Sequence, residues 1–171
     1  MKKLLLLAAC CSLLAGCGYN LVGKGNFLPA TIHTIEVPAF VNRTTRVELE
    51  QRVTQAVADE FVSRGRLRLV TQPNDADAIL RGSIDSFGIN PIGFNAQGIA
   101  TQYQISITAK IELIDHRNND AVIWKNDQYR FTENYQVDVT TGDTFDQETR
   151  AIREIAVRFA ESLVANLLEG F

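Results

Sequence analysis

The segment from Tyr103 to Leu113 constrains the fold most, because its apolar and polar residues alternate without interruption. The apolar positions are Tyr103, Ile105, Ile107, Ala109, Ile111 and Leu113, and polar residues stand between them. A period of two over this length predicts a β-strand of about 35 Å with one buried face and one wet face. Such a strand is typical of an antiparallel sheet that is covered on one side only.

Four further segments supply partner strands, since each is rich in β-branched or aromatic residues, or is bounded by turn residues. They run over residues 32–37, 67–70, 78–87 and 121–137. The polar stretch 115–120 predicts a hairpin connection into the last of them. In that last strand the apolar phase changes between Trp124 and Tyr129, which predicts a β-bulge near residues 125–127.

Two amphipathic helices complete the pattern. The first covers residues 46–64 and ends at Gly65, where a left-handed residue is favoured. Its apolar residues recur at helical spacing: Leu49, Val53, Ala56, Val57 and Phe61. The second begins at Asp143 or Thr144 and ends at Gly170, and its apolar face is formed by Ile152, Ile155, Ala156, Phe159, Leu163 and Leu167.

The order of these elements, β-α-β-β-β-β-α, sets the expected fold class. It predicts an α+β fold, a two-layer sandwich in which two helices cover one face of a mostly antiparallel sheet of about four to five strands. The stretch that ends at residue 30 is irregular and rich in Gly and Pro, so we expect residues 17–30 to be a linker. A single domain is then expected over residues 31–171.

The N-terminus predicts a lipid anchor. Lys2 and Lys3 precede an apolar run from Leu4 to Leu14, which is followed by Ala15-Gly16-Cys17. This is the pattern of a bacterial lipobox: residues 1–16 form a signal peptide that is cleaved, and a diacylglycerol is attached to Cys17. The apolar run is too short to span a bilayer, which needs about 20 residues.

Cysteine count and charge exclude several function classes. Cys10 and Cys11 leave with the signal peptide and Cys17 carries lipid, so we expect no thiol for a disulfide, a metal or a nucleophile. Without Lys2 and Lys3 the chain has 15 basic residues against 20 acidic ones, and it has no basic run. We therefore expect no nucleic-acid partner.

The motifs of common enzyme classes are absent from the sequence, which contains no GxSxG, no phosphate-binding Gly-rich loop and no HExxH. The two histidines, His33 and His116, have no second ligand or carboxylate at a local metal-binding spacing. They are interpreted as a strand residue and a turn residue. We therefore expect a protein that is not an enzyme and that has no cofactor or metal.

One connection is longer than a hairpin requires. Residues 88–98 read GINPIGFNAQG and place Ile89, Ile92 and Phe94 among glycines and a proline. Loops on a rigid scaffold often carry binding function, and exposed apolar side chains indicate a partner that covers them. The hypothesis is that Ile89, Ile92 and Phe94 bind a partner. The alternative, equally open, is that they fold back onto the sheet edge.

With these elements in order, the chain resembles the LptE family of lipopolysaccharide (LPS)-assembly lipoproteins. The matching residues are Gly16-Cys17-Gly18-Tyr19-Asn20-Leu21, Pro29, Leu80-Arg81-Gly82, Tyr103-Gln104 and the amphipathic C-terminal helix. The resemblance covers the chain from Cys17 to about Leu168, and it depends on the order and spacing of the matches.

The resemblance implies an outer-membrane lipoprotein that acts as a plug and assembly subunit inside the LPS-export β-barrel, LptD, and that contacts LPS on its way outward. Gly18 after the lipidated cysteine fits outer-membrane sorting. In the family, basic loop residues have been implicated in meeting LPS phosphates, but residues 88–98 and 138–145 contain no Lys or Arg. The competing interpretation is a periplasmic lipoprotein that regulates a cell-wall synthase or serves a secretion pore, as the stretch Val37–Thr44 also permits.

Overall fold

A computed structural model describes residues 28–137 and 144–169 of the chain. Its elements, in chain order, are β1 (Thr34–Glu36), β2 (Val41–Asn42), α2 (Leu49–Arg64), β3 (Arg68–Val70), the short 3-10 helix η1 (Pro73–Asp75), β4 (Ala78–Phe94), β5 (Ala100–Asp115), β6 (Ala121–Gln136) and α3 (Thr144–Glu169). Several predicted features lie outside the described residues: the signal peptide, Cys17, and the residues Asp143 and Gly170 at the predicted ends of the second helix.

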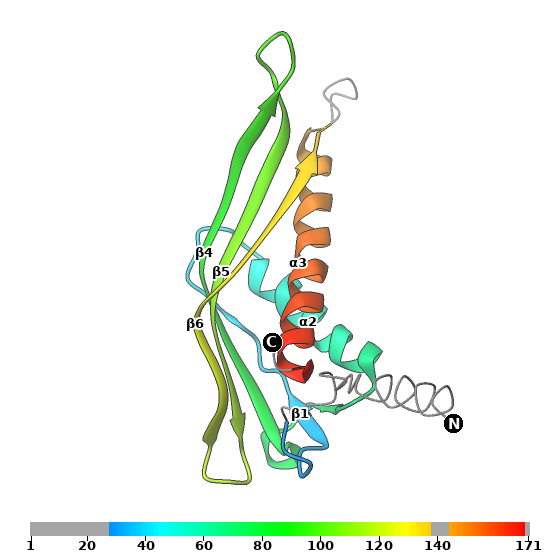
Figure 1. The fold of residues 1–171 in the computed structure, drawn as a ribbon, viewed down its shortest axis with the longest axis vertical. Helices are drawn as coiled ribbons and strands as arrows, with labels where there is room; N and C mark the ends of the chain where they lie inside the picture. Colours follow the sequence, from blue (N-terminus) through cyan, green and yellow to red (C-terminus); the bar gives the residue numbers. More distant parts are fainter. Residues whose placement is uncertain (1–27, 138–143, 170–171) are drawn as a thin grey trace, which may run out of the picture.

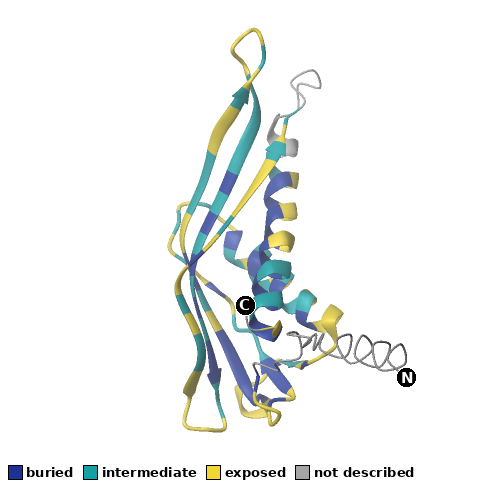
Figure 2. Ribbon diagram, viewed as in Figure 1, coloured by how far each residue is buried: buried dark blue, intermediate teal, exposed yellow. Residues whose placement is uncertain are grey.

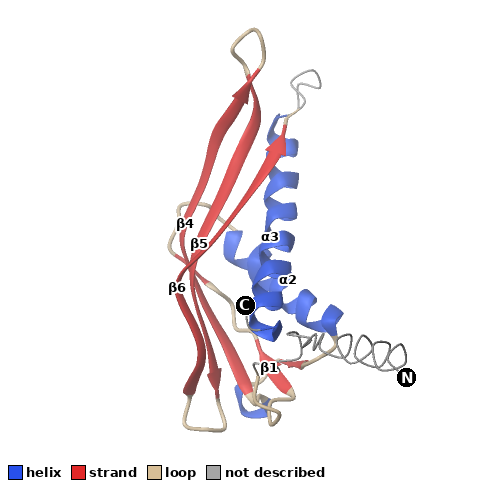
Figure 3. Ribbon diagram, viewed as in Figure 1, coloured by secondary structure: helices blue, strands red, loops and turns tan. Residues whose placement is uncertain are grey.

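The elements form two layers, with α2 and α3 on one face of a single sheet (Figures 1 and 3). The sheet order is β3-β1-β4-β5-β6, and β2 also pairs with β4. The three long strands pair antiparallel, whereas the short β1, β2 and β3 pair parallel to their neighbours. The predicted α+β two-layer sandwich is therefore confirmed, with a mixed sheet.

The clearest sequence pattern becomes the central long strand. From Ile105 to Leu113 the side chains of β5 alternate between buried and partly exposed, and Ile105, Ile107, Ala109, Ile111 and Leu113 are at most 1% exposed. These residues face the helices and join one core with the buried faces of both. The core residues of α2 are Leu49, Val53, Val57 and Phe61.

Two local predictions are confirmed. Gly65 ends α2 in the left-handed conformation, with φ 62°, and its N–H donates to the carbonyl of Phe61. The register of β6 against β5 slips between Asn126 and Tyr129, which places a bulge at residues 127–128, next to the predicted position.

The largest difference concerns β4, which runs seven residues beyond the predicted end at Phe87 and reaches Phe94. Most of the predicted connection 88–98 is therefore strand, and the turn is confined to residues 95–99. Pro91 is tolerated because it pairs opposite Tyr103 at a position where its nitrogen faces away from β5, along a free edge of the sheet. Two register shifts, at Pro91–Gly93 and Gly93–Phe94, absorb the irregular sequence.

The long strands divide into two regions, an arm and a base. The arm consists of residues 87–94, 100–108 and 129–136, and it projects past the short strands (Figure 1). The base is the remainder of the sheet together with α2. Buried positions concentrate where the helices cover the sheet, and the far end of the hairpin is exposed or intermediate (Figure 2). In residues 28–137 and 144–169, no helix has both the length and the apolar content that crossing a bilayer requires.

Candidate partner-binding surface

The tip of the arm is a hairpin turn that is fixed by its own hydrogen bonds. The side-chain oxygen of Asn95 accepts from the N–H groups of Gln97 (3.0 Å) and Ile99 (2.9 Å). Gly98 has φ 75°, a conformation that favours glycine, and its N–H donates to the carbonyl of Asn95. The turn therefore holds the residues on either side of it in defined positions.

Three apolar side chains are exposed beside this turn. Ile92 is 45% exposed, Phe94 is 61% exposed and Ile99 is 50% exposed. Ile89, in contrast, is partly buried and packs against the core. Among the residues predicted to bind a partner, Ile92 and Phe94 are thus available at the tip and Ile89 is on the core side. Sequence reasoning missed Ile99, although it immediately precedes the strand that pairs with Phe94.

The face of the arm that points away from the helices is polar and almost free of charge. The pairing register places on this face residues Gly88, Asn90, Gly93, Gln102, Gln104, Ser106, Thr108, Thr132, Asn134 and Gln136. Arg130, at the border with the base, is the charged member of this face. The corresponding face of the base is charged, with Lys110 and Lys125 each within 3.5 Å of carboxylates of Glu112 and Asp127.

Two positions on the outer face of the arm are glycines, which carry no projecting side chain. A Cβ added to Gly88 would lie 3.1 Å from the hydroxyl of Ser106, and one added to Gly93 would lie 3.0 Å from the Cβ of Gln102. Both distances are tighter than ordinary carbon contacts, so neighbouring side chains occupy the space above these glycines. The result is a flat, hydrogen-bonding surface.

The opposite face of the arm carries a pair of aromatic rings next to the start of α3. Tyr103 and Tyr135 stack with their ring centres 5.4 Å apart. Burial raises the pKa of the Tyr135 hydroxyl above its ordinary value, and the nearby carboxylate of Glu148 adds to the effect. This tyrosine therefore stays neutral and serves as a wall of the space between β6 and α3.

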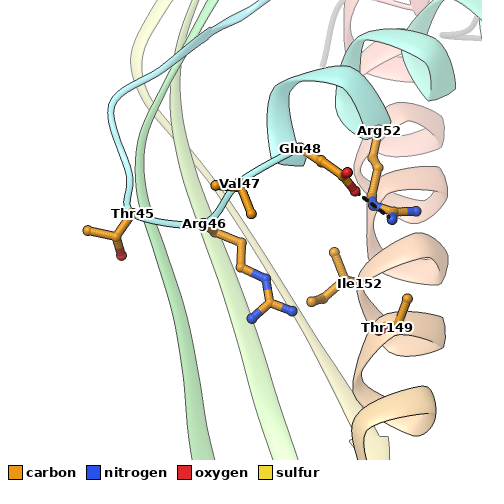
Figure 4. A pocket seen from close by; sticks show the side chains of 7 residues that line it. All are labelled: Thr45, Arg46, Val47, Glu48, Arg52, Thr149 and Ile152. Carbon is orange, nitrogen blue, oxygen red and sulfur yellow. Dashed lines mark hydrogen bonds and ion pairs between the residues drawn. The ribbon is translucent and has the colours of Figure 1, made fainter.

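A hollow of about 530 Å³ lies between the start of α2 and α3 (Figure 4). Ion pairs cross it or border it: Arg46 contacts Glu148 at 2.8 Å, and Arg52 contacts Glu48 at 3.2 Å. Glu48 holds the left-handed conformation, φ 63°, at the entry to α2. The carboxylate of Glu48 in this lining is paired with Arg52, and the ion pairs join the start of α2 to α3.

Asp77 is a buried acid whose role is structural. Its carboxylate accepts the backbone N–H groups of His33 and Thr34, both at 2.9 Å, and it pairs with Arg117. Burial alone raises the pKa of Asp77, but these hydrogen bonds and the Arg117 charge outweigh burial and hold the pKa below its ordinary value. The carboxylate thereby ties β1 to the start of β4.

The histidines occupy separate places. His33 uses its backbone N–H on Asp77, whereas the ring of His116 contacts Asp120 at 2.8 Å in the β5–β6 turn. Over the described ranges, no group of His, Cys, Asp and Glu side chains is arranged to hold a metal ion.

The LptE family, described as lipopolysaccharide-assembly, matches residues 32–167, which is well over half of the chain. The chain belongs to the LptE family. As a member, it is a membrane-associated lipoprotein of the LPS-assembly type, in a family of accessory proteins that are not enzymes. No match is found among curated protein sequences.

Solved structures share this LptE-type fold at low identity. The PelC dodecamer from Paraburkholderia phytofirmans is 15% identical with a TM-score of 0.50, over 80% of this chain and 88% of that one. Rare lipoprotein B from Shewanella oneidensis is 14% identical with a TM-score of 0.50, over 77% and 92%. Lipoprotein B from Nitrosomonas europaea is 11% identical with a TM-score of 0.50, over 86% and 91%. At these identities the likeness is one of fold alone.

Proposed function

We propose that this chain is the plug and assembly subunit of the outer-membrane LPS translocon, seated inside an LptD-like β-barrel. In this proposal residues 1–16 are removed, Cys17 carries the lipid that holds the protein at the outer membrane, and residues 31–171 act as one domain. The role is to support barrel assembly and LPS insertion by binding, without catalysis.

The observation that carries the proposal is the flat polar face of the arm. Membrane β-barrels present polar side chains to their interior and apolar ones to lipid. Gln102, Gln104 and Ser106 offer hydrogen-bond donors and acceptors without charge. Such a face fits a polar wall without the desolvation penalty that a buried charge carries.

The exposed tip residues Ile92, Phe94 and Ile99 extend this surface with apolar contacts. We assign them to the barrel and not to LPS phosphates, because residues 88–99 contain no Lys or Arg.

Co-purification tests the partner. Tagged full-length chain is co-expressed with the LPS-export barrel of the same organism and captured from membranes in mild detergent. We expect the barrel to be recovered with the chain in about equal amounts. Recovery of a cell-wall synthase in place of the barrel would favour the periplasmic regulator and contradict the proposal.

A pair of arginine variants links the interaction to the arm. Ser106→Arg places a long charged side chain on the flat face, and barrel recovery is expected to fall at least severalfold. Gln55→Arg adds the same side chain at an exposed position on α2 and should leave recovery unchanged. Equal recovery with both variants would show that the outer face is not buried against the barrel.

The lipid anchor is tested by Cys17→Ser. Without the thiol no thioether can form, so the variant is expected to remain unprocessed or to appear in the soluble fraction. Mass measurement of the membrane-bound wild type should give the chain from Cys17 with its acyl groups. Normal processing and membrane retention of the serine variant would contradict the anchor assignment.

A further inference from the structure

The upper part of β6, from Tyr129 to Gln136, is a free strand edge that is bordered by a groove. No strand among residues 28–137 lies beyond β6 in the sheet order. Free edges expose unpaired N–H and C=O groups and are templates for another strand unless something blocks them.

The register identifies which backbone groups are free. Val137 donates its N–H to the carbonyl of Thr101 at 2.9 Å, which marks a hydrogen-bonded pair. In an antiparallel ladder such pairs alternate, and the register from here to the Ala109–Tyr129 pair is unbroken. The groups that point away from β5 therefore belong to Arg130, Thr132, Asn134 and Gln136.

The two halves of this edge differ in how they are blocked. In the base, β6 has both of its register shifts and carries Lys125 and Asp127, features that discourage edge pairing. From Tyr129 to Gln136 the strand has no bulge and no proline. The edge is thus protected along the base and left regular along the arm.

Beside the regular edge, β6 and α3 enclose a groove with two hollows. One, of about 120 Å³, is lined by Glu133 and Tyr135 on the strand and Ile155 on the helix. The other, of about 170 Å³, is lined by Tyr135, Gln136, Arg150 and Ala151. Glu154 borders both.

The two hollows follow one another along β6. Residues 133–135 line the first and residues 135–136 the second, and Ala151 of α3 lines both. Side chains on one face of a strand recur every two residues. Alternate side chains of an added strand would enter the two hollows in turn. Known strand-addition sites use this division, in which backbone bonds supply affinity and side-chain pockets supply specificity.

We propose that this edge and groove bind an extended segment of the barrel partner by strand addition. The inference rests on the proposed function for the identity of the partner. A closed barrel has no free edge in its wall, so the segment comes from a loop or a terminal arm.

The chemistry of the groove defines the segment. Its floor is apolar, at Ala151 and Ile155, and the charges of Arg150 and Arg158 are balanced by Glu133 and Glu154. Small neutral apolar side chains therefore fit the groove positions. Polar side chains fit the alternate positions, which lie beside Thr132 and Asn134 on the outer face.

Proline substitution tests the backbone bonds directly. Thr132→Pro/Asn134→Pro removes two outward N–H groups that β5 does not use, so the fold should be retained. Loss of two hydrogen bonds predicts that barrel recovery falls about tenfold or more. The matched control, Thr132→Ala/Asn134→Ala, removes the same two side chains from the outer face but keeps both N–H groups, so the proline pair should recover about tenfold less barrel than the alanine pair. Thermal unfolding of each variant verifies that the domain is folded.

Site-specific cross-linking identifies the occupant. A photo-reactive amino acid at position 133, whose side chain lines the groove and does not lie on the outer face, should cross-link in the co-expressed complex to one short segment of the barrel protein, and one at position 55 should not. A cross-link to a second copy of this chain, or wild-type recovery with the double proline variant, would overturn the inference. Barrel recovery by the wild type without a cross-link at 133 would overturn this inference alone, whereas absence of the barrel altogether would overturn the proposed function.

Discussion

The base and the arm are built from the same three long strands but use them differently. In the base, helices cover one face, the other face carries paired charges, and the short strands or a bulged edge flank the sheet. In the arm, the outer face is almost free of charge, with Arg130 at its border, the tip is apolar and both edges are free among the described residues. The base is organised for stability, and the arm keeps surfaces available for a partner.

The comparison predicts that stability depends mainly on the base. Phe61 on α2 is 1% exposed, and Phe61→Ala would leave a cavity in the core. We expect the free energy of unfolding to fall by about 3–5 kcal/mol, measured by urea denaturation. Val62→Ala, at a 60% exposed position on the same helix, should change it little. A small loss for Phe61→Ala would mean that the base is not the stabilising region.

Two glycines of β4 allow a matched test of packing in the two regions. A Cβ at Gly82, in the base, would overlap the buried ring of Phe40, so Gly82→Ala should cost about 1–3 kcal/mol. A Cβ at Gly88, in the arm, would meet the hydroxyl of Ser106 at 3.1 Å, which can move, and the amide nitrogen of Asn90 at an ordinary 3.7 Å. Gly88→Ala should therefore cost less in the same thermal or urea measurement. The reverse order would contradict the division into a tight base and an adaptable arm.

Asp77 gives the base a dependence on pH. Because its pKa is lowered in the folded state, its contribution to stability is present above the ordinary carboxyl pKa of about 4 and is lost as pH falls through the folded value. Asp77→Asn should lower the free energy of unfolding by about 1–2 kcal/mol at pH 7. Below about pH 3 the difference from wild type should shrink. A difference that is constant with pH would rule out the charged form as the source.

The smallest effect on stability is expected at the tip. Phe94→Asp replaces an exposed side chain, so the free energy of unfolding should change by less than about 0.5 kcal/mol. Barrel recovery, in contrast, should weaken because an apolar contact is replaced by a charge. A fall of many degrees in the thermal midpoint would place Phe94 in the core. Unchanged recovery of the barrel would show that the tip is not part of the binding surface.

Local patterns predicted most of the elements correctly. The alternation in β5, the helical spacing of Leu49, Val53 and Phe61, and the glycine at the end of α2 each depend on neighbours within a few residues. The predicted end of β4 at Phe87 was wrong, because Pro91 and two glycines indicate a loop when the sequence alone is considered. The strand tolerates these residues because this part of β4 lies at an edge of the sheet. It is an edge because the neighbouring short strands do not extend this far.

The candidate surface was predicted only in part. Ile92 and Phe94 were recognisable as apolar residues in a Gly-rich stretch, and they are exposed at the tip. Ile89 occurs in the same stretch, but strand pairing turns it toward the core. The polar outer face could be anticipated from the alternation in β5, whereas the groove beside β6 brings together residues 133–136 and 150–158, which no local pattern connects.

The sequence by itself determined the fold class, the family resemblance and the expectation of a lipid at Cys17, since these depend on short-range periodicity and ordered motifs. The tertiary structure decided how far β4 extends, which face and edge of the arm remain free, and that Asp77 joins β1 to β4. The physical reason is that strand pairing and burial are long-range. A residue is core, edge or surface according to which distant segment lies beside it.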